Sequence, residues 1–311
     1  MKNRRSVLCG IAMLCCVMAT TMISCKKNDA AFIQLEQADE LSLPQDDVLS
    51  IDTVLNTFNE TGIAGNTAMP EAAYVRKNLL FNYTTELSNS LTALTAYSTS
   101  YWNTLAKCCT HSIQRSTAYS RSGSYATRYE LNKTDADVAS SKRTESNRFS
   151  RDEKIPYVER WYGSSYYLPS EFVSDNAPEI LTQWHTTVGG NPPLALWTHK
   201  GQWKIVQFGT TSTVIGNYER NKWTDFVFHI KWSAGADGLI EIWKGGVKVF
   251  SKTGKNIYSG LTYGAYMKAG IYKWAWKSGT FTSSTTKRVV YIDDVRIGNA
   301  AATYNDVAPG L

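Results

Sequence analysis

Three short segments of this 311-residue chain place polar side chains at alternating positions. In a β-strand, every second residue lies on the same face, about 7 Å from the last, so alternating polar groups can reach one ligand together. The segments are Lys142-Arg143-Thr144-Glu145, Gln183-Trp184-His185 and Tyr266-Met-Lys-Ala-Gly-Ile-Tyr272.

As strands, these segments would direct their functional groups to one surface. Gln183 and His185 would point together while Trp184 faces the core. Lys268, Gly270 and Tyr272 would share a second face, with Gly270 leaving room for a ligand near the backbone. Guanidinium, amide and ammonium groups can hold a carboxylate, and His and Tyr can exchange protons.

Each segment also fits an ordinary structural role. Arg143 could be an exposed strand arginine paired with Glu145. Such a surface ion pair contributes little to stability. Gln183 and His185 could form a buried polar pair, and the run ending at Tyr272 could be an amphipathic strand. The three segments together are more informative than any one of them.

The rest of the chain indicates the elements that must position these residues. Short alternating runs, separated by Gly, Asn, Asp and Ser, begin near residue 112 and continue to the end of the chain. Lys244-Gly245-Gly246 between two such runs predicts a hairpin. Many short strands with few helices predict a two-sheet sandwich or jelly roll. The predicted strands span 125–131, 159–168, 224–232, 239–243, 247–250 and 288–297. Residues 71–110 are less regular; 72–80 could form a short helix, and 87–105 a helix or an irregular strand.

Residues 112–298 resemble the heparin lyase I-like polysaccharide lyases, and more distantly the jelly-roll alginate and glucuronan lyases. Gln183-Trp-His185 and Tyr266-Met-Lys-Ala-Gly-Ile-Tyr272 are the specific elements of this resemblance, and the others mainly fix the fold. Those others are Arg128-Tyr-Glu130, Lys142-Arg-Thr-Glu145, Glu159-Arg-Trp-Tyr-Gly163, Pro192-Pro-Leu-Ala-Leu196, Trp223-Thr-Asp-Phe226 and Tyr291-Ile-Asp-Asp-Val-Arg-Ile-Gly298. The resemblance implies an all-β, concanavalin-like jelly roll with two antiparallel sheets and a concave groove.

The resemblance also implies a reaction. Such lyases remove the C5 proton of a uronic-acid unit and expel the 4-linked sugar, which leaves an unsaturated uronate. Arg143, Gln183 and Lys268 would stabilise the carboxylate as negative charge develops. His185 and Tyr272 would act as base and acid, and the C5 stereochemistry decides which removes the proton. We also expect four substrate-binding residues: Glu145, Tyr266, Lys273 and Trp274.

The first residues predict export and lipidation. A basic start precedes an apolar run over 7–22 that is too short to span a membrane as a mature helix, which is typical of a signal peptide over 1–24. Met22-Ile23-Ser24-Cys25 resembles a bacterial lipobox, with Cys25 lipidated; a plain signal peptide is the alternative. We expect a polar tether over 25–75, a lyase-like domain over 76–311, and a lipid-anchored monomer on the outer membrane or cell surface, or on its periplasmic side.

Charge narrows the choice of partner. The formal net charge is +6 for the whole chain, and residues 1–24 carry three basic and no acidic groups, so the mature charge is 6 − 3 = +3. The cations of the strand region form no compact cluster, which favours a uronate polymer with little or no sulfate and argues against nucleic acid. These cations are Lys248, Lys252, Lys255, Lys287 and Arg288.

No cofactor is required by this interpretation. Asp293 and Asp294 would lie on opposite strand faces, so either could give one ligand to a structural Ca²⁺, or be a solvated carboxylate beside Arg296. Cys108 and Cys109 are the two cysteines beyond Cys25, and we expect buried thiols or an unusual redox feature, because neighbours rarely bridge. Cysteine and histidine spacing gives no zinc motif.

Three other functions compete with the lyase. A non-catalytic cell-surface glycan-binding jelly-roll module would keep the aromatic residues without the catalytic set. A jelly-roll glycoside hydrolase would need a pair of carboxylates around the glycosidic bond, and the sequence shows no such strand motif. A purely structural surface lipoprotein is the third.

Overall fold

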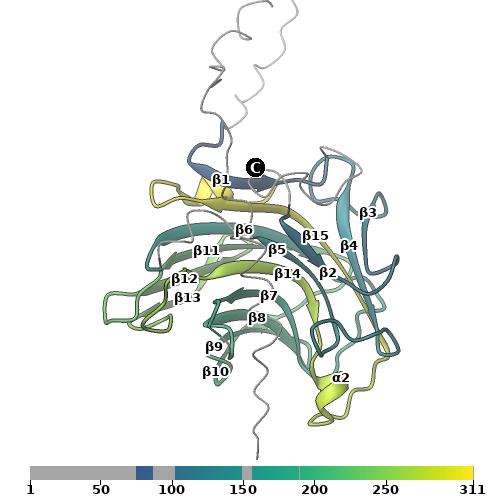
Figure 1. Cartoon of the computed structure of the whole chain (residues 1–311). Coiled ribbons are helices and arrows are strands. Elements are labelled where there is room, and N and C mark those ends of the chain that lie inside the picture. Colours follow the sequence, from purple (N-terminus) through teal and green to yellow (C-terminus); the bar gives the residue numbers. More distant parts are fainter. Residues whose placement is uncertain (1–74, 87–101, 149–155, 189, 311) are drawn as a thin grey trace, which may run out of the picture. The chain divides into compact units, whose positions relative to one another are not determined.

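The computed structural model describes residues 75–86, 102–148, 156–188 and 190–310. The chain divides into two compact units, Met1–Glu60 and Thr61–Leu311, and every described residue belongs to the second. This unit is a two-layer β structure (Figure 1). No helix within the described ranges has the length and hydropathy needed to cross a membrane.

The first sheet has eight strands, all paired antiparallel. Its order is β13-β12-β11-β6-β15-β4-β3, and β1 pairs with the second half of β15. The bounds are β1 Leu79–Tyr83, β3 Ile113–Ser116, β4 Ala126–Asn132, β6 Glu159–Tyr167, β11 Trp223–Lys231, β12 Leu239–Lys244, β13 Val247–Thr253 and β15 Lys287–Gly298.

The second sheet has seven antiparallel strands in the order β10-β9-β8-β7-β14-β5-β2. Two single-turn helices, α2 Ala275–Ser278 and α3 Tyr304–Val307, follow β14 and β15. The strand bounds are β2 Thr104–Ala106, β5 Arg143–Arg148, β7 Glu179–His185, β8 Leu194–His199, β9 Gln202–Gln207, β10 Thr211–Asn217 and β14 Tyr266–Tyr272.

Aromatic side chains from both sheets fill the core between the layers. Trp184 of β7 meets Phe228 of β11 edge-on at 4.8 Å between ring centroids, and Trp203 of β9 meets Phe226 at 5.0 Å. Edge-to-face pairs contribute about 0.5–1.5 kcal/mol each beyond burial itself. These contacts tie the second sheet to the first and fix which of its faces points outward.

The all-β, two-sheet prediction is confirmed, and strands occur at each of the six predicted runs. Gly245 and Gly246 have φ of 55° and 83° and form the predicted hairpin turn between β12 and β13. The helix expected at 72–80 is wrong for its described part, because Leu79 begins β1 and pairs with β15. Of the ambiguous 87–105 segment, residues 87–101 lie outside the described residues, and Thr104 begins β2.

Candidate active site

Three adjacent strands of the second sheet carry the predicted catalytic residues on one face, with His185 and Tyr272 at opposite ends of the β7–β14 pairing. In β14, Met267, Ala269 and Ile271 are fully buried in the core, so the alternate residues face outward. The register pairs Tyr272 with Arg143 of β5, and Lys268 with Gln183 of β7. Tyr266 pairs with His185 at the far end of the same strands. The five expected catalytic residues therefore share the outer face of the second sheet, and Trp184 and Ile271 point into the core as predicted.

Glu145 anchors two of the expected carboxylate-binding groups. The Gln183 amide donates a hydrogen bond to Glu145 Oε1 at 2.5 Å, and Arg143 Nη1 lies 3.4 Å from Glu145 Oε2. Glu145 and Gln183 are buried, with 2% and 1% of their surface exposed. We expected Glu145 to contact substrate; the structure places it beneath the donors, where it orients them. The ion pair between Arg143 and Glu145, expected as the purely structural role of Arg143, is therefore present, and it lies within the candidate site.

Two of the buried polar atoms on this face have no hydrogen-bond partner among the described residues. Arg143 Nε and Asn147 Oδ1 have no hydrogen bond to any residue that the structure describes. Asn147 lies opposite Lys268 in the register, so both atoms belong to the same patch of strands. Buried polar groups without partners are costly, and a bound ligand could satisfy these two.

The environment of His185 suits it to accept a proton. His185 Nδ1 lies 2.7 Å from the carbonyl oxygen of Thr186, which can only accept, so Nδ1 carries the hydrogen of the neutral ring. Nε2 is then the unprotonated nitrogen. Burial, aided by the nearby positive charge of Lys268, lowers the pKa of His185 from its ordinary value of 6.5. The ring is therefore neutral at pH 7.

Tyr272 lies beneath a cation and beside further aromatic rings. The Arg143 guanidinium carbon lies 4.1 Å from the centroid of the Tyr272 ring. Trp274 is 5.7 Å from Tyr272 and 4.6 Å from Trp197 of β8, between ring centroids. Trp197 was missed from the sequence, although the alternation of buried Leu194 and Leu196 places it on the outer face.

Gly270 is required by the sheet itself. Its φ is 143°, and a Cβ added there would lie 2.2 Å from the carbonyl oxygen of Thr144 in β5. The expectation that this glycine makes room for a ligand is therefore corrected, because the neighbouring strand occupies the space. Gly270 lets β5 and β14 approach closely, which brings Arg143 to Tyr272.

Lys273 lies away from the expected substrate face. Its side chain is 0% exposed, with Nζ 2.6 Å from Glu179 Oε2 and 3.0 Å from Asp175 Oδ2. Arg288 makes a further ion pair with Glu179. β14 ends at Tyr272, and the next side chain turns inward, so the predicted substrate contact is corrected to a place in this buried charge cluster. Burial raises the pKa of Asp175, but hydrogen bonds from Ser283 and Thr285 and the charge of Lys273 hold it below its ordinary value.

Asp293 and Asp294 are both fully buried, so neither is a solvated carboxylate. Asp294 has a φ of 53°, and the pairing of β15 with β6 is irregular between Asp293 and Arg296. This bulge breaks the expected alternation and brings both carboxylates to Ser122. Asp294 Oδ1 lies 2.8 Å from Arg296, as the ion-pair alternative predicted. A Ca²⁺ role for either carboxylate stays a prediction.

Cys108 and Cys109 are joined by a disulfide, so of the two expectations, buried thiols or an unusual redox feature, the first is wrong. Their Cα atoms are 3.7 Å apart, in the turn between β2 and β3. Both are half-buried. Disulfides between neighbouring cysteines are rare in general, which is why the sequence does not predict this one. Here both cysteines lie in the turn between β2 and β3.

Comparison with known proteins gives the class of this chain. Residues 93–296 match the model of the family described as polysaccharide lyase, so the chain belongs to that family and is a polysaccharide lyase. No curated protein sequence matches the chain.

Solved structures of lyases are similar to this chain at low sequence identity. An endo-β-1,4-glucuronan lyase from the fungus Trichoderma reesei is 18% identical, with a TM-score of 0.55, over 67% of this chain and 94% of that one. An alginate lyase from Aplysia kurodai is 11% identical, with a TM-score of 0.48, over 71% and 99% of the two chains. The alginate lyase Aly36B is 12% identical, with a TM-score of 0.48, over 72% and 98%.

Proposed function

We propose that this chain cleaves a uronic-acid-containing polysaccharide by β-elimination and leaves an unsaturated uronate at the new end. The observation that carries the proposal is the placement of His185 and Tyr272 on one sheet face with Arg143, Gln183 and Lys268. Proton-transfer groups beside a set of carboxylate-binding donors are what this elimination requires.

The residues divide into two tasks. Arg143, Gln183 and Lys268 bind the uronate carboxylate and stabilise the negative charge that develops when the C5 proton leaves. Glu145 orients the first two of these donors. His185 and Tyr272 remove the C5 proton and protonate the departing 4-oxygen, and the stereochemistry at C5 assigns the two roles.

The charge distribution favours an unsulfated polymer. Lys248 and Lys287 are paired with Glu241 and Glu130, so these strand cations are already partly neutralised. Lys252 donates to Gln207. Sulfated chains need dense positive charge, whereas one carboxylate per sugar needs the few cations of this face. Glucuronan is the first candidate, since the similar fungal structure is named as a lyase for it.

A polymer panel tests the proposal. The full chain is incubated with glucuronan, alginate and heparin while the ultraviolet absorbance of unsaturated uronate is followed. Product from glucuronan or alginate, with little or none from heparin, supports it. Product from heparin alone contradicts the assignment to unsulfated polymers. Binding of a uronate polymer without any product would favour the glycan-binding module instead.

The proposal includes a position in the cell. The lipobox-like Met22–Cys25 segment supports a diacylated Cys25 that holds the enzyme on the bacterial outer membrane or cell surface as a monomer. An enzyme tethered there would meet polymers too large to enter the cell. These residues lie outside the described ranges, so the support is the sequence pattern alone.

A further inference from the structure

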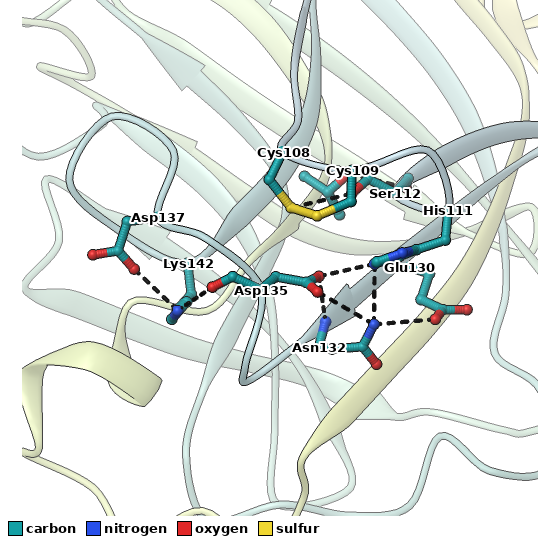
Figure 2. Close-up of a disulfide and its surroundings, with 10 residues drawn as sticks. Cys108, Cys109, His111, Ser112, Glu130, Asn132, Asp135, Asp137 and Lys142 are labelled. Atoms are coloured by element: carbon teal, nitrogen blue, oxygen red, sulfur yellow. Dashed lines mark hydrogen bonds and ion pairs between the residues drawn. A yellow bond between two sulfur atoms is a disulfide. The ribbon is translucent and has the colours of Figure 1, made fainter.

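A cluster of potential metal ligands lies outside the lyase site, at the end of the first sheet. The Sγ atoms of Cys108 and Cys109 and a carboxylate oxygen of Asp135 all lie within 4.8 Å of one another. The cysteines come from the turn between β2 and β3, and Asp135 from the turn after β4. Figure 2 shows the disulfide directly above the Asp135 side chain.

The carboxylate of Asp135 is held in place by its neighbours. Asp135 is buried, and its Oδ2 accepts hydrogen bonds from the backbone N–H of Asn132 at 2.8 Å and from His111 Nε2 at 3.0 Å (Figure 2). Its own carbonyl oxygen accepts from Lys142. Carboxylates that ligate metals are themselves hydrogen-bonded by outer partners, and His111 is such a partner of Asp135. The ligand is therefore positioned before any ion arrives.

We propose that reduction of the Cys108–Cys109 disulfide opens a Zn²⁺ site made by the two thiolates and Asp135, with His111 as a positioning residue. Two thiolates and a carboxylate are a donor set that zinc accepts. Three protein ligands leave the fourth tetrahedral position to water. The site is independent of the proposed lyase chemistry.

The half-buried position of the two cysteines allows their sulfur atoms to separate after reduction. In a tetrahedral site with Zn–S bonds of about 2.3 Å, two sulfurs stand roughly 3.8 Å apart, so they must separate once their bond is broken. Both side chains are partly exposed, which leaves them space to move and lets a reductant reach them. The Ser112 hydroxyl lies 3.7 Å from Cys108 Sγ and can donate to the thiolate.

Reduction of the Cys108–Cys109 disulfide is a balanced reaction when a phosphine is the reductant. A water-soluble trialkylphosphine gives two electrons to the disulfide and becomes its oxide by taking an oxygen from water. The two hydrogens of that water protonate the sulfurs. Zn²⁺ then displaces up to two thiol protons when it binds, so affinity rises with pH. The oxidised disulfide has no thiolate to offer, so it binds no zinc.

The experiment uses the full-length chain with Cys9, Cys15, Cys16 and Cys25 changed to Ser, so that Cys108 and Cys109 are the two remaining cysteines of the six. Phosphine-reduced and oxidised samples are freed of reductant without air and titrated with Zn²⁺ against a chromophoric chelator. Co²⁺ replaces zinc in a parallel sample to reveal thiolate-to-metal charge-transfer absorbance. We expect one zinc per reduced chain, with that absorbance for Co²⁺, and none for the oxidised chain.

Substitutions separate the proposed ligands from their surroundings. Asp135→Asn should weaken zinc binding by at least about tenfold, and His111→Gln by about tenfold through the misplaced carboxylate. Asp137→Asn is the matched control, since Asp137 pairs with Lys142 and Lys277 and is not in the cluster; it should bind zinc normally. Circular dichroism confirms that each variant is folded.

Several results would overturn the proposal. They are equal zinc binding by the oxidised chain, no binding by the reduced chain, or undiminished binding by a folded Cys108→Ser/Cys109→Ser variant. Equal loss of binding in Asp135→Asn and Asp137→Asn would do the same, because it would show a general effect of surface charge.

Discussion

At the scale of single residues, the site combines a neutral histidine, a tyrosine and a set of cationic and amide donors. Glu145 is the least expected member, because a carboxylate near a uronate site would repel substrate. Its two oxygens are engaged by Gln183 and Arg143, and it is buried below them. Its charge therefore orients the two donors and is not presented at the outer surface of the sheet.

Loss of the Tyr272 hydroxyl should stop proton transfer without disturbing the fold. Tyr272→Phe keeps the ring under the Arg143 guanidinium, so stability and polymer binding should survive. Turnover should fall by about 10²–10⁴-fold, the typical effect of losing a general acid or base. Initial rates of unsaturated product measure this, with Tyr119→Phe, in the loop between β3 and β4 of the other sheet, as control. A Tyr272→Phe enzyme with nearly normal rates would remove Tyr272 from the mechanism.

The pH profile should report a neutral His185. Its pKa is lowered from 6.5 by burial and by Lys268, so half of the rings become protonated, and lose their function as a base, only at a pH below that value. The value of kcat/KM should therefore fall toward acid pH with a midpoint below 6.5. His185→Ala should lose activity and this acid limb together. A value of kcat/KM that falls as the pH rises through this midpoint would show that protonated His185 is the active form.

At the scale of elements, the site depends on the contact of β14 with β5 and β7. Gly270 allows the approach to β5, and the buried Lys273–Glu179 pair joins the end of β14 to the start of β7. Lys273 follows Tyr272 directly, so the pair also fixes the strand end that carries the tyrosine.

Breaking that pair should destabilise the protein strongly. Lys273→Met leaves the buried carboxylates of Glu179 and Asp175 with less compensating charge, and removing one partner of a buried pair costs about 3–5 kcal/mol. Chemical denaturation measures the free energy of unfolding. Lys277→Met is the control, because its side chain is 49% exposed and pairs with Asp137 at the surface. Similar losses in the two variants would refute a special role for the buried cluster.

The strand pattern predicted the outer faces well and the pairings poorly. Alternation in 266–272 was enough to separate Lys268 and Tyr272 from Ile271. Nothing local could reveal that Glu145 bonds Gln183, because strand pairing decides it across 38 positions. The prediction that Lys273 binds substrate is wrong because side chains alternate between the two faces only within the strand, and β14 ends at Tyr272. The disulfide and the Asp294 bulge were missed for a related reason, since each depends on a backbone conformation that residue types do not specify.

At the scale of the whole molecule, the enzyme is a two-sheet β structure that we propose is carried on a lipid. Removal of the proposed signal peptide, whose positions 1–24 hold three basic and no acidic residues, would leave a net charge of 6 − 3 = +3. That charge is too small for strong attraction to sulfated polymers, which fits the proposed unsulfated substrate.

Cys25→Ser should release the protein from membranes with its folded domain intact. The reason is that two acyl chains on Cys25 would supply the anchoring energy, and serine cannot be lipidated in this way. Membrane fractionation with mass analysis of the N-terminal residue tests it. An unacylated N-terminus at another position in the unaltered protein would contradict the lipoprotein assignment.

The central claim, β-elimination at the β5–β14–β7 face, is tested most directly by analysing the products formed in water labelled with heavy oxygen. Elimination breaks the bond without adding water, so the account predicts products with an unsaturated uronate end and no label introduced at cleavage. Changing both His185→Ala and Tyr272→Phe should abolish these products in a chain that still folds. Labelled reducing ends without unsaturated product would mean hydrolysis, and would contradict the account.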